Sequence, residues 1–196
     1  IPRNLRRLHL LTGSRVVFYR LQSVLIAFAG CTGAVNDHAA VSHSFTVNRA
    51  VGILYPTEGS NVTGKVYFIQ TDSGIHITAE VKGLSEGLHG IHIHENADCS
   101  ANDGSSAGGH WNPTFEDHGK WGDSNGYHRG DIGNFDVNSE GTGSITFTTD
   151  KWCIGCEDEK MNIVGKSVIV HDGEDDFTSQ PSGDAGSRVG CAEIVE

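Results

Sequence analysis

Imidazole side chains are concentrated in one part of this sequence, residues 90–131, which holds five of the chain's eleven histidines. The candidates for chemistry in this part are His92, His94, His110, His118, His128 and Asp131. A further candidate, His171, follows the apolar run of residues 168–170. A packed core does not need so many titratable rings, whereas transition metals bind imidazole nitrogen well. The sequence therefore predicts a site for two metal ions.

The spacing of these residues indicates how they would bind metal. His92 and His94 lie two positions apart, so on a strand both rings point to the same side of the sheet. This pair alone does not choose the metal, because copper, zinc, iron and nickel all accept imidazole. The three later histidines and Asp131 offer three nitrogens and one oxygen, which suits tetrahedral zinc. Each of them alone could be a loop residue satisfied by hydrogen bonds, but their joint occurrence favours metal binding.

The elements that would position these residues are short strands. Residues 75–82 alternate apolar with polar side chains, which is the period-two pattern of a half-buried strand. Other apolar or alternating runs cover residues 51–55, 62–68, 88–94, 132–137, 143–148, 166–170 and 190–194. The chain has 26 glycines, four prolines and no convincing helical pattern. These features predict an all-β fold with eight antiparallel strands in a barrel or sandwich.

Two long stretches lack a strand pattern and contain or flank the candidate ligands. The first covers residues 95–130, which is long for a structureless connection inside a compact domain. Metal coordination and a disulfide from Cys99 would order it. The second, residues 172–187, follows His171 and carries five acids without a lysine. We expect both stretches to be functional loops.

The charge of the chain is acidic overall and unevenly distributed. A net charge of −11 argues against a nucleic-acid partner, because phosphate binding requires a basic face. Residues 1–30 nevertheless hold five of the 14 Lys and Arg and no acid, and the apolar run 24–30 within them precedes Cys31. This pattern is typical of an export signal, and the alternative is a basic amphipathic helix that the mature protein keeps. We therefore predict an export signal at 1–31, a flexible tether at 32–47 and one folded domain at 48–196.

The five cysteines support a periplasmic or extracellular location. The residues before Cys31 resemble a bacterial lipoprotein processing site, which makes Cys31 a candidate for lipidation and membrane anchoring. The other four, Cys99, Cys153, Cys156 and Cys191, form an even number, which suits disulfides in an oxidising compartment. For Cys153 and Cys156 we favour a local disulfide over a pair of thiols that binds Cu(I).

Several motifs resemble those of the copper/zinc superoxide dismutases. The sequence GLHGIHIHE at residues 87–95 is similar to the strand signature of that family. Three further segments resemble later blocks of the family, in the same order and with compatible spacing: GHWNP at 109–113, GDIGN at 130–134 and GSRVGC at 186–191. The resemblance covers about residues 50–195. The small residues 105–109 before His110 are closer to exported bacterial members than to cytosolic eukaryotic ones.

The resemblance implies a Greek-key barrel with copper and zinc as cofactors. It implies that copper is held by His92, His94, His110 and His171. It implies that zinc is held by His110, His118, His128 and Asp131, with the His110 ring bridging the two metals. Asp175 matches a carboxylate that joins copper and zinc histidines through their free ring nitrogens and so fixes their orientation.

The same resemblance implies the reaction and the roles of the remaining residues. Superoxide would be converted to dioxygen and hydrogen peroxide, with His110 handling protons and Arg188 attracting the anionic substrate. Cys99 and Cys191 would form a disulfide that ties the first long loop to the last strand. His89 matches a structural histidine and not a ligand. A homodimer is a further expected assembly.

Two other functions account for part of the sequence. A module that stores or delivers copper or zinc without turnover would use the same ligands, but inactive family members usually lack a copper ligand or the arginine. An immunoglobulin-like adhesion sandwich leaves the ligand cluster unexplained. Lysines that steer superoxide in many members are missing from residues 172–187, so Lys120, Arg129 or Lys151 would have to replace them. We expect activity below the diffusion ceiling.

Overall fold

Alternating side chains form strands here because the apolar residues of one face can be buried together. In β3, Gly74–Lys82, the apolar residues at every second position are buried, and the residues that alternate with them are more exposed. The structure is a computed structural model that describes residues 48–196. Its other strands are β1 (Arg49–Pro56), β2 (Thr63–Thr71), β4 (Gly87–His94), β5 (Gly133–Val137), β6 (Thr142–Thr149), β7 (Ser167–His171) and β8 (Arg188–Glu193). The predicted export signal, the tether and the candidate lipidation site Cys31 lie outside the described residues.

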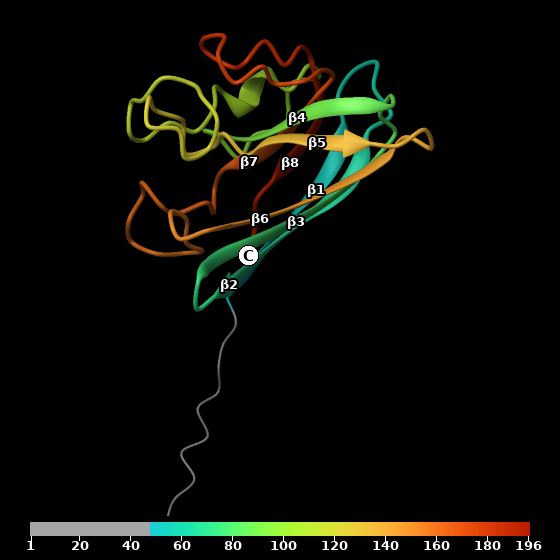
Figure 1. Cartoon of the computed structure of the whole chain (residues 1–196). Coiled ribbons are helices and arrows are strands. Elements are labelled where there is room, and N and C mark those ends of the chain that lie inside the picture. Colours follow the sequence, from blue (N-terminus) through green and yellow to red (C-terminus); the bar gives the residue numbers. More distant parts are fainter. Residues whose placement is uncertain (1–47) are drawn as a thin grey trace, which may run out of the picture. The chain divides into compact units, whose positions relative to one another are not determined.

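All eight strands join one closed antiparallel barrel (Figure 1), which confirms the predicted all-β, eight-stranded fold. Around the barrel the strand order is β1-β2-β3-β6-β5-β4-β7-β8. The chain therefore crosses over twice, from β3 to β4 and from β6 to β7, in the manner of a Greek key. The barrel closes where β1 pairs with β8, with Tyr55 opposite Cys191. Within the described residues the helical content is one short 3₁₀ turn, η1, Ser105–Ala107.

Two long loops leave the barrel from neighbouring strands. The first loop, residues 95–132, follows β4, and the second loop, residues 172–187, follows β7. Because β4 and β7 are paired antiparallel, the first loop leaves one end of this strand pair and the second loop leaves the other; they are yellow-green and red in Figure 1. A disulfide between Cys99 and Cys191 joins the first loop to β8. The loops therefore cover one side of β4 and β7.

Strand β4 is buried on both of its faces along most of its length. Ile91 and Ile93 belong to the hydrophobic core inside the barrel. His92 and His94 alternate with them and therefore point to the other side of the sheet, yet they are no more than 1% exposed. The two loops that cover this side account for their burial. The fold thus places imidazole rings in a closed space between the barrel wall and the loops.

The connection between β6 and β7 packs against the first loop through aromatic side chains. Trp152 is buried and lies 5.6 Å from Trp121 of the first loop and 5.5 Å from Phe147 of β6, measured between ring centroids. Its indole nitrogen Nε1 donates a hydrogen bond of 2.9 Å to the carbonyl oxygen of Arg129. The aromatic contacts anchor the middle of the first loop on the barrel.

A second disulfide, between Cys153 and Cys156, lies in the same connection. The side chain of Asn162 braces this short turn, because its Oδ1 accepts the Gly155 N–H at 3.1 Å and its Nδ2 donates to the Cys156 carbonyl at 3.2 Å. The turn is therefore held by side-chain and covalent links and contains no helix. Across the described part of the chain, no helix has the length and apolar character needed to cross a membrane.

Candidate metal centre

Two groups of four side chains bring their ligand atoms within 4.8 Å of one another. The first group consists of His92, His94, His110 and His171, and the second consists of His110, His118, His128 and Asp131. All of these residues are buried. Strand β4 and the end of β7 supply three of the histidines, and the first loop supplies the other four residues. His110 belongs to both groups, so two bound ions would share its ring.

Each of the three strand histidines has one ring nitrogen engaged and the other free. The engaged atoms are His92 Nε2, 2.8 Å from Asp175 Oδ2, His94 Nδ1, 3.0 Å from the Gly108 oxygen, and His171 Nδ1, 3.4 Å from the Gly186 oxygen. The opposite nitrogens of these rings, and Nε2 of His110, are buried without a hydrogen-bond partner. An unpaired buried polar atom costs about 1–3 kcal/mol. Four converging imidazole nitrogens of this kind fit a copper ion.

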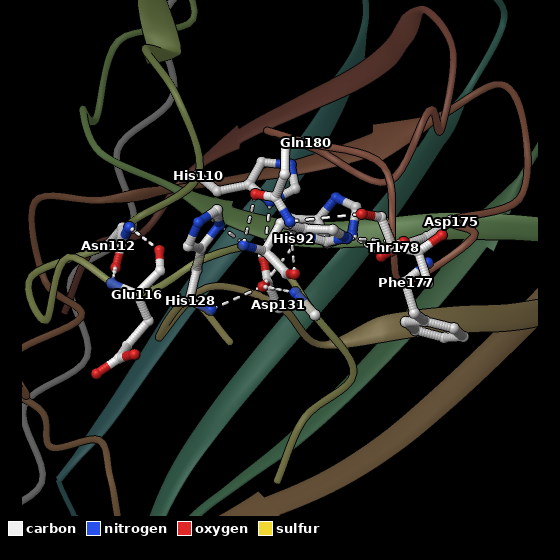
Figure 2. Close-up of polar contacts among 12 residues, drawn as sticks. His92, His110, Asn112, Glu116, His128, Asp131, Asp175, Phe177, Thr178 and Gln180 are labelled. Carbon is white, nitrogen blue, oxygen red and sulfur yellow. Dashed lines mark hydrogen bonds and ion pairs between the residues drawn. The ribbon is translucent and has the colours of Figure 1, made fainter. Parts of the chain in front are cut away.

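Asp131 lies at the centre of the second group (Figure 2). Its Oδ1 is 2.8 Å from His110 Nδ1 and 3.2 Å from His128 Nδ1, and its Oδ2 is 3.0 Å from His118 Nδ1. The Nδ1 atoms of His118 and His128 have no aligned hydrogen-bond partner, although they are this close to the carboxylate. Backbone N–H groups of Gly119 and His128 donate to Oδ2 and fix the carboxylate. Three nitrogens and one oxygen in this arrangement fit tetrahedral zinc.

Asp175 of the second loop connects the two groups. Its Oδ2 lies 2.8 Å from His92 Nε2, and its Oδ1 lies 2.9 Å from His118 Nε2. The side chain of Asn134 in turn holds the backbone of Asp175, because it accepts the N–H and donates to the carbonyl, each at 2.8 Å. A buried carboxylate held in this way sets the orientation of both rings.

The two groups differ in protonation. Burial lowers the pKa of His94 and His171 well below the usual range, and burial together with a neighbouring ring lowers the pKa of His110 to about 4. Burial also disfavours charge on His118, but the two carboxylates beside it outweigh burial and raise its pKa to about 9. Burial would raise the pKa of those carboxylates, but hydrogen bonds from His110 to Asp131, and from His118 and His92 to Asp175, hold their pKa values well below the usual range. Without metal, His118 therefore carries a proton at neutral pH.

A cavity of about 450 Å³ opens beside the first group. Its walls include ligand histidines, Glu95 of the first loop, Pro181 and Ser182 of the second loop, and Arg188. The Arg188 guanidinium donates two hydrogen bonds of 2.7 Å to carbonyl oxygens of the first loop, which hold it in the cavity wall. Arg188 is the one arginine or lysine among the described residues that line the cavity. An anion that enters would therefore meet a fixed positive charge next to the histidines.

The structure brings the residues predicted from the sequence together. All seven predicted ligands lie in the two groups, Asp175 lies between the groups, and Arg188 lies in the cavity wall. The four cysteines of the domain are joined as Cys99–Cys191 and Cys153–Cys156. His89 lies in neither group, and its ring nitrogens face the carbonyl oxygens of His171 and Ser85 at 2.9 and 3.0 Å. Lys120, Arg129 and Lys151 do not line this cavity.

Some functional contacts had no signal in the sequence. The carbonyl oxygen of Gly108 accepts hydrogen bonds from both His94 Nδ1 and Arg188 Nη2. The side chain of Gln180 contacts the backbone of His118. These contacts depend on how two irregular loops fold against each other, and neither a motif nor a periodic pattern identifies the residues that make them.

Comparison with known proteins places the chain in a family. The family model described as copper/zinc superoxide dismutase (SODC) matches residues 62–194. The chain is 34% identical, over 89% of its length and 98% of the relative, to a Drosophila melanogaster protein named extracellular superoxide dismutase [Cu-Zn]. It is 38% identical, over 70% of its length and 93% of the relative, to superoxide dismutase [Cu-Zn] 5 of Dictyostelium discoideum.

Solved structures agree with this placement. A SOD-like protein from Bacillus subtilis, solved as a double mutant, aligns with a TM-score of 0.66 at 30% identity and covers 74% of this chain and 97% of its own. The clock protein EA4 aligns with a TM-score of 0.67 at 33% identity and covers 76% of this chain and 94% of its own. The chain belongs to the copper/zinc superoxide dismutase family, and its two ligand groups fit the metals of that name. The expected closeness to exported bacterial members is not confirmed by these relatives.

Proposed function

We propose that this protein dismutates superoxide at a histidine-bridged copper/zinc site outside the cytoplasm. The observation that carries this proposal is that two groups of four buried ligands share His110 and present ring nitrogens with no protein partner. The names of the two curated relatives, both superoxide dismutases, support the same activity. Bound copper would supply one-electron exchange with superoxide, and bound zinc would hold the loop ligands together.

The protein's own residues would bind, orient and supply protons. Arg188 would hold the superoxide anion in the cavity beside the first group, because its charge is fixed there by two backbone carbonyls. His110 would take up and release a proton at Nε2, the atom that faces the first group without a partner. Two superoxide ions and two protons then give one dioxygen and one hydrogen peroxide. Burial of the ligands keeps bulk water away from the rings.

The location outside the cytoplasm is supported by two observations. Disulfides join four cysteines of the domain, and disulfides persist in oxidising compartments. One relative that aligns with 89% of the chain is named extracellular. Recovery of the protein in the culture medium or periplasm, with both disulfides intact by mass spectrometry, would support export, and reduced protein in the cytosol would contradict it.

The activity is tested with a matched pair of histidine variants. We expect wild-type protein to hold one copper and one zinc per chain and to consume superoxide only when copper is loaded. His171→Ala removes one ligand of the first group and should lower superoxide consumption by about a hundredfold or more, because losing even a group that supports a metal ligand costs about 10–100-fold in metal affinity or activity. The control His76→Ala changes a histidine on the outer face of β3 that contacts Thr148 and should keep wild-type activity.

The outcome of this experiment also separates the two candidate functions. Stoichiometric metal without turnover in wild-type protein would identify a module that stores or delivers copper or zinc. Full activity in His171→Ala would contradict the assignment of His171 to the copper group. Metal content, measured by elemental analysis on the same samples, distinguishes a lost ion from a lost reaction.

We further propose that two copies associate through the outer face of β1. Ile53 and Tyr55 on this strand are exposed, as is Val195, which pairs with Val51 near the start of the strand, and the four residues line a depression. Among the described residues, Glu193 is the one acidic residue that lines this depression. Two acidic molecules would therefore avoid most like-charge repulsion if they met at this apolar face.

A further inference from the structure

The side chain of Gln180 pairs with both backbone polar groups of His118. Its Oε1 accepts the His118 N–H at 2.9 Å, and its Nε2 donates to the His118 carbonyl oxygen, also at 2.9 Å. Gln180 reaches the ligand cluster from the second loop (Figure 2). Among the described residues, the main chain of His118 has no other backbone hydrogen bond. One carboxamide thus satisfies the whole backbone of one ligand residue.

The second loop is folded so that Gln180 is presented to His118. The carboxylate of Asp176 accepts hydrogen bonds from the N–H groups of Thr178 and Ser179, each at 2.8 Å, and so fixes the turn before Gln180. Beyond it, Gly183 has a φ of +69°, and a Cβ there would lie 2.6 Å from Nε2 of His118. The loop therefore packs directly against the His118 ring as well as its backbone.

We propose that Gln180 is a positioning residue that holds His118 in place as a zinc ligand. This inference rests on the proposed copper/zinc site. His118 lies in a loop without regular secondary structure, so neighbouring strands cannot fix its backbone. Asp175 fixes the outer nitrogen of the ring, and Gln180 fixes the main chain, so that Nδ1 is left facing Asp131. Three contacts from one loop thereby determine the position of one ligand atom.

We call the pair of hydrogen bonds between Gln180 and the His118 backbone the clamp. The clamp also makes zinc binding and the order of the second loop depend on each other. The second loop begins after His171 and ends before Arg188, which are a candidate copper ligand and the arginine of the cavity wall. A zinc ion that fixes His118 stabilises the partner of Gln180 and hence the loop. A loop fixed by Gln180 in turn slows the departure of His118 from the ion.

The experiment measures how fast zinc leaves the fully loaded protein when an excess of a chromophoric chelator is added. Gln180→Ala removes both hydrogen bonds, and Gln180→Met removes them while keeping a similar side-chain volume. We expect zinc release roughly tenfold faster in both variants, at the lower end of the effect of losing a group that orients a metal ligand. The control Gln70→Ala removes a glutamine whose Nε2 donates to the Thr71 carbonyl in β2, and it should release zinc at the wild-type rate.

A second measurement separates ligand positioning from general destabilisation. Cobalt(II) substituted for zinc has a visible spectrum that depends on ligand geometry, so it should change in both Gln180 variants while the thermal unfolding temperature of the metal-free barrel stays close to wild type. Wild-type release rates with an unchanged cobalt spectrum would overturn the clamp and leave the proposed site intact. Failure of wild-type protein to hold zinc would instead overturn the proposed metal site and the clamp with it.

Discussion

At the scale of single residues, the same ring type carries different protonation in the two ligand groups. His94 and His171 lie away from carboxylates, and burial lowers their pKa, so both are neutral at pH 7. His118 lies between Asp131 and Asp175, which raise its pKa to about 9. A metal ion binds only the neutral ring. Copper therefore meets neutral rings at His94, His110 and His171, whereas zinc must displace a proton from His118.

This difference predicts distinct pH dependences of metal uptake. Because His118 stays protonated below its pKa of about 9, zinc affinity of the metal-free protein should rise about tenfold per unit between roughly pH 7 and pH 9. His94, His110 and His171 add no such dependence to copper uptake there, because their pKa values already lie lower. Competition with a chelator at several pH values measures both slopes. Asp175→Asn should move the zinc dependence to lower pH, and equal slopes for the two metals would contradict the assignment.

The sequence predicted the candidate ligands because their chemistry is local. The spacing of His92 and His94 fixes their common direction once β4 forms, and histidine density alone marks the first loop. Gln180 could not be identified in this way, because its role depends on a hydrogen-bonded pair with His118, 62 positions away in the chain. The cluster of Trp121, Phe147 and Trp152 is likewise a product of how the loop lies on the barrel. Contacts between irregular segments leave no periodic pattern in sequence.

At the scale of elements, apolar and alternating runs predicted the eight strands, but they did not predict the residues at which each strand begins and ends. The run expected at residues 132–137 begins as β5 at Gly133, and the run expected at 166–170 extends as β7 to His171. Both boundaries lie at the loops, where contacts of the candidate ligands and of the loop backbone replace the sheet ladder. His171 is thus the last strand residue as well as a candidate ligand, which attaches one possible donor directly to the barrel.

The two disulfides should contribute unequally to stability. Cys99–Cys191 closes a segment with a sequence separation of 92, whereas Cys153–Cys156 has a separation of 3. In the chain-entropy account these correspond to about 4–5 and about 2 kcal/mol. Replacing both cysteines of the first pair by serine should therefore lower the free energy of unfolding of the metal-free protein more than the same change in the second pair. Urea unfolding of the two double variants measures this, and equal losses would contradict it.

At the scale of the whole molecule, the proposed pairing of two copies can be tested by charge. Tyr55 is 65% exposed on the outer face of β1, so Tyr55→Glu would place a charge inside the proposed interface. We expect sedimentation to report a dimer for wild-type protein and a monomer for this variant. Leu88→Glu is a matched control, because Leu88 is 44% exposed on β4, away from β1 in the barrel order. A wild-type monomer, or a dimer that survives Tyr55→Glu, would exclude this interface.

The closure of the barrel also determines where aggregation would begin. Each described strand has a partner on both sides, so no free edge is offered to another chain. The junction between β5 and β6 has the fewest paired residues in the barrel. Val137 and Gly143 form its one paired position, whereas β5 pairs with β4 at five. Separation there would expose one edge of β5 and one of β6. The pairing of β4 with β7, which carries His92, His94 and His171, is not part of this junction, so molecules could begin to join edge to edge before these three histidines separate.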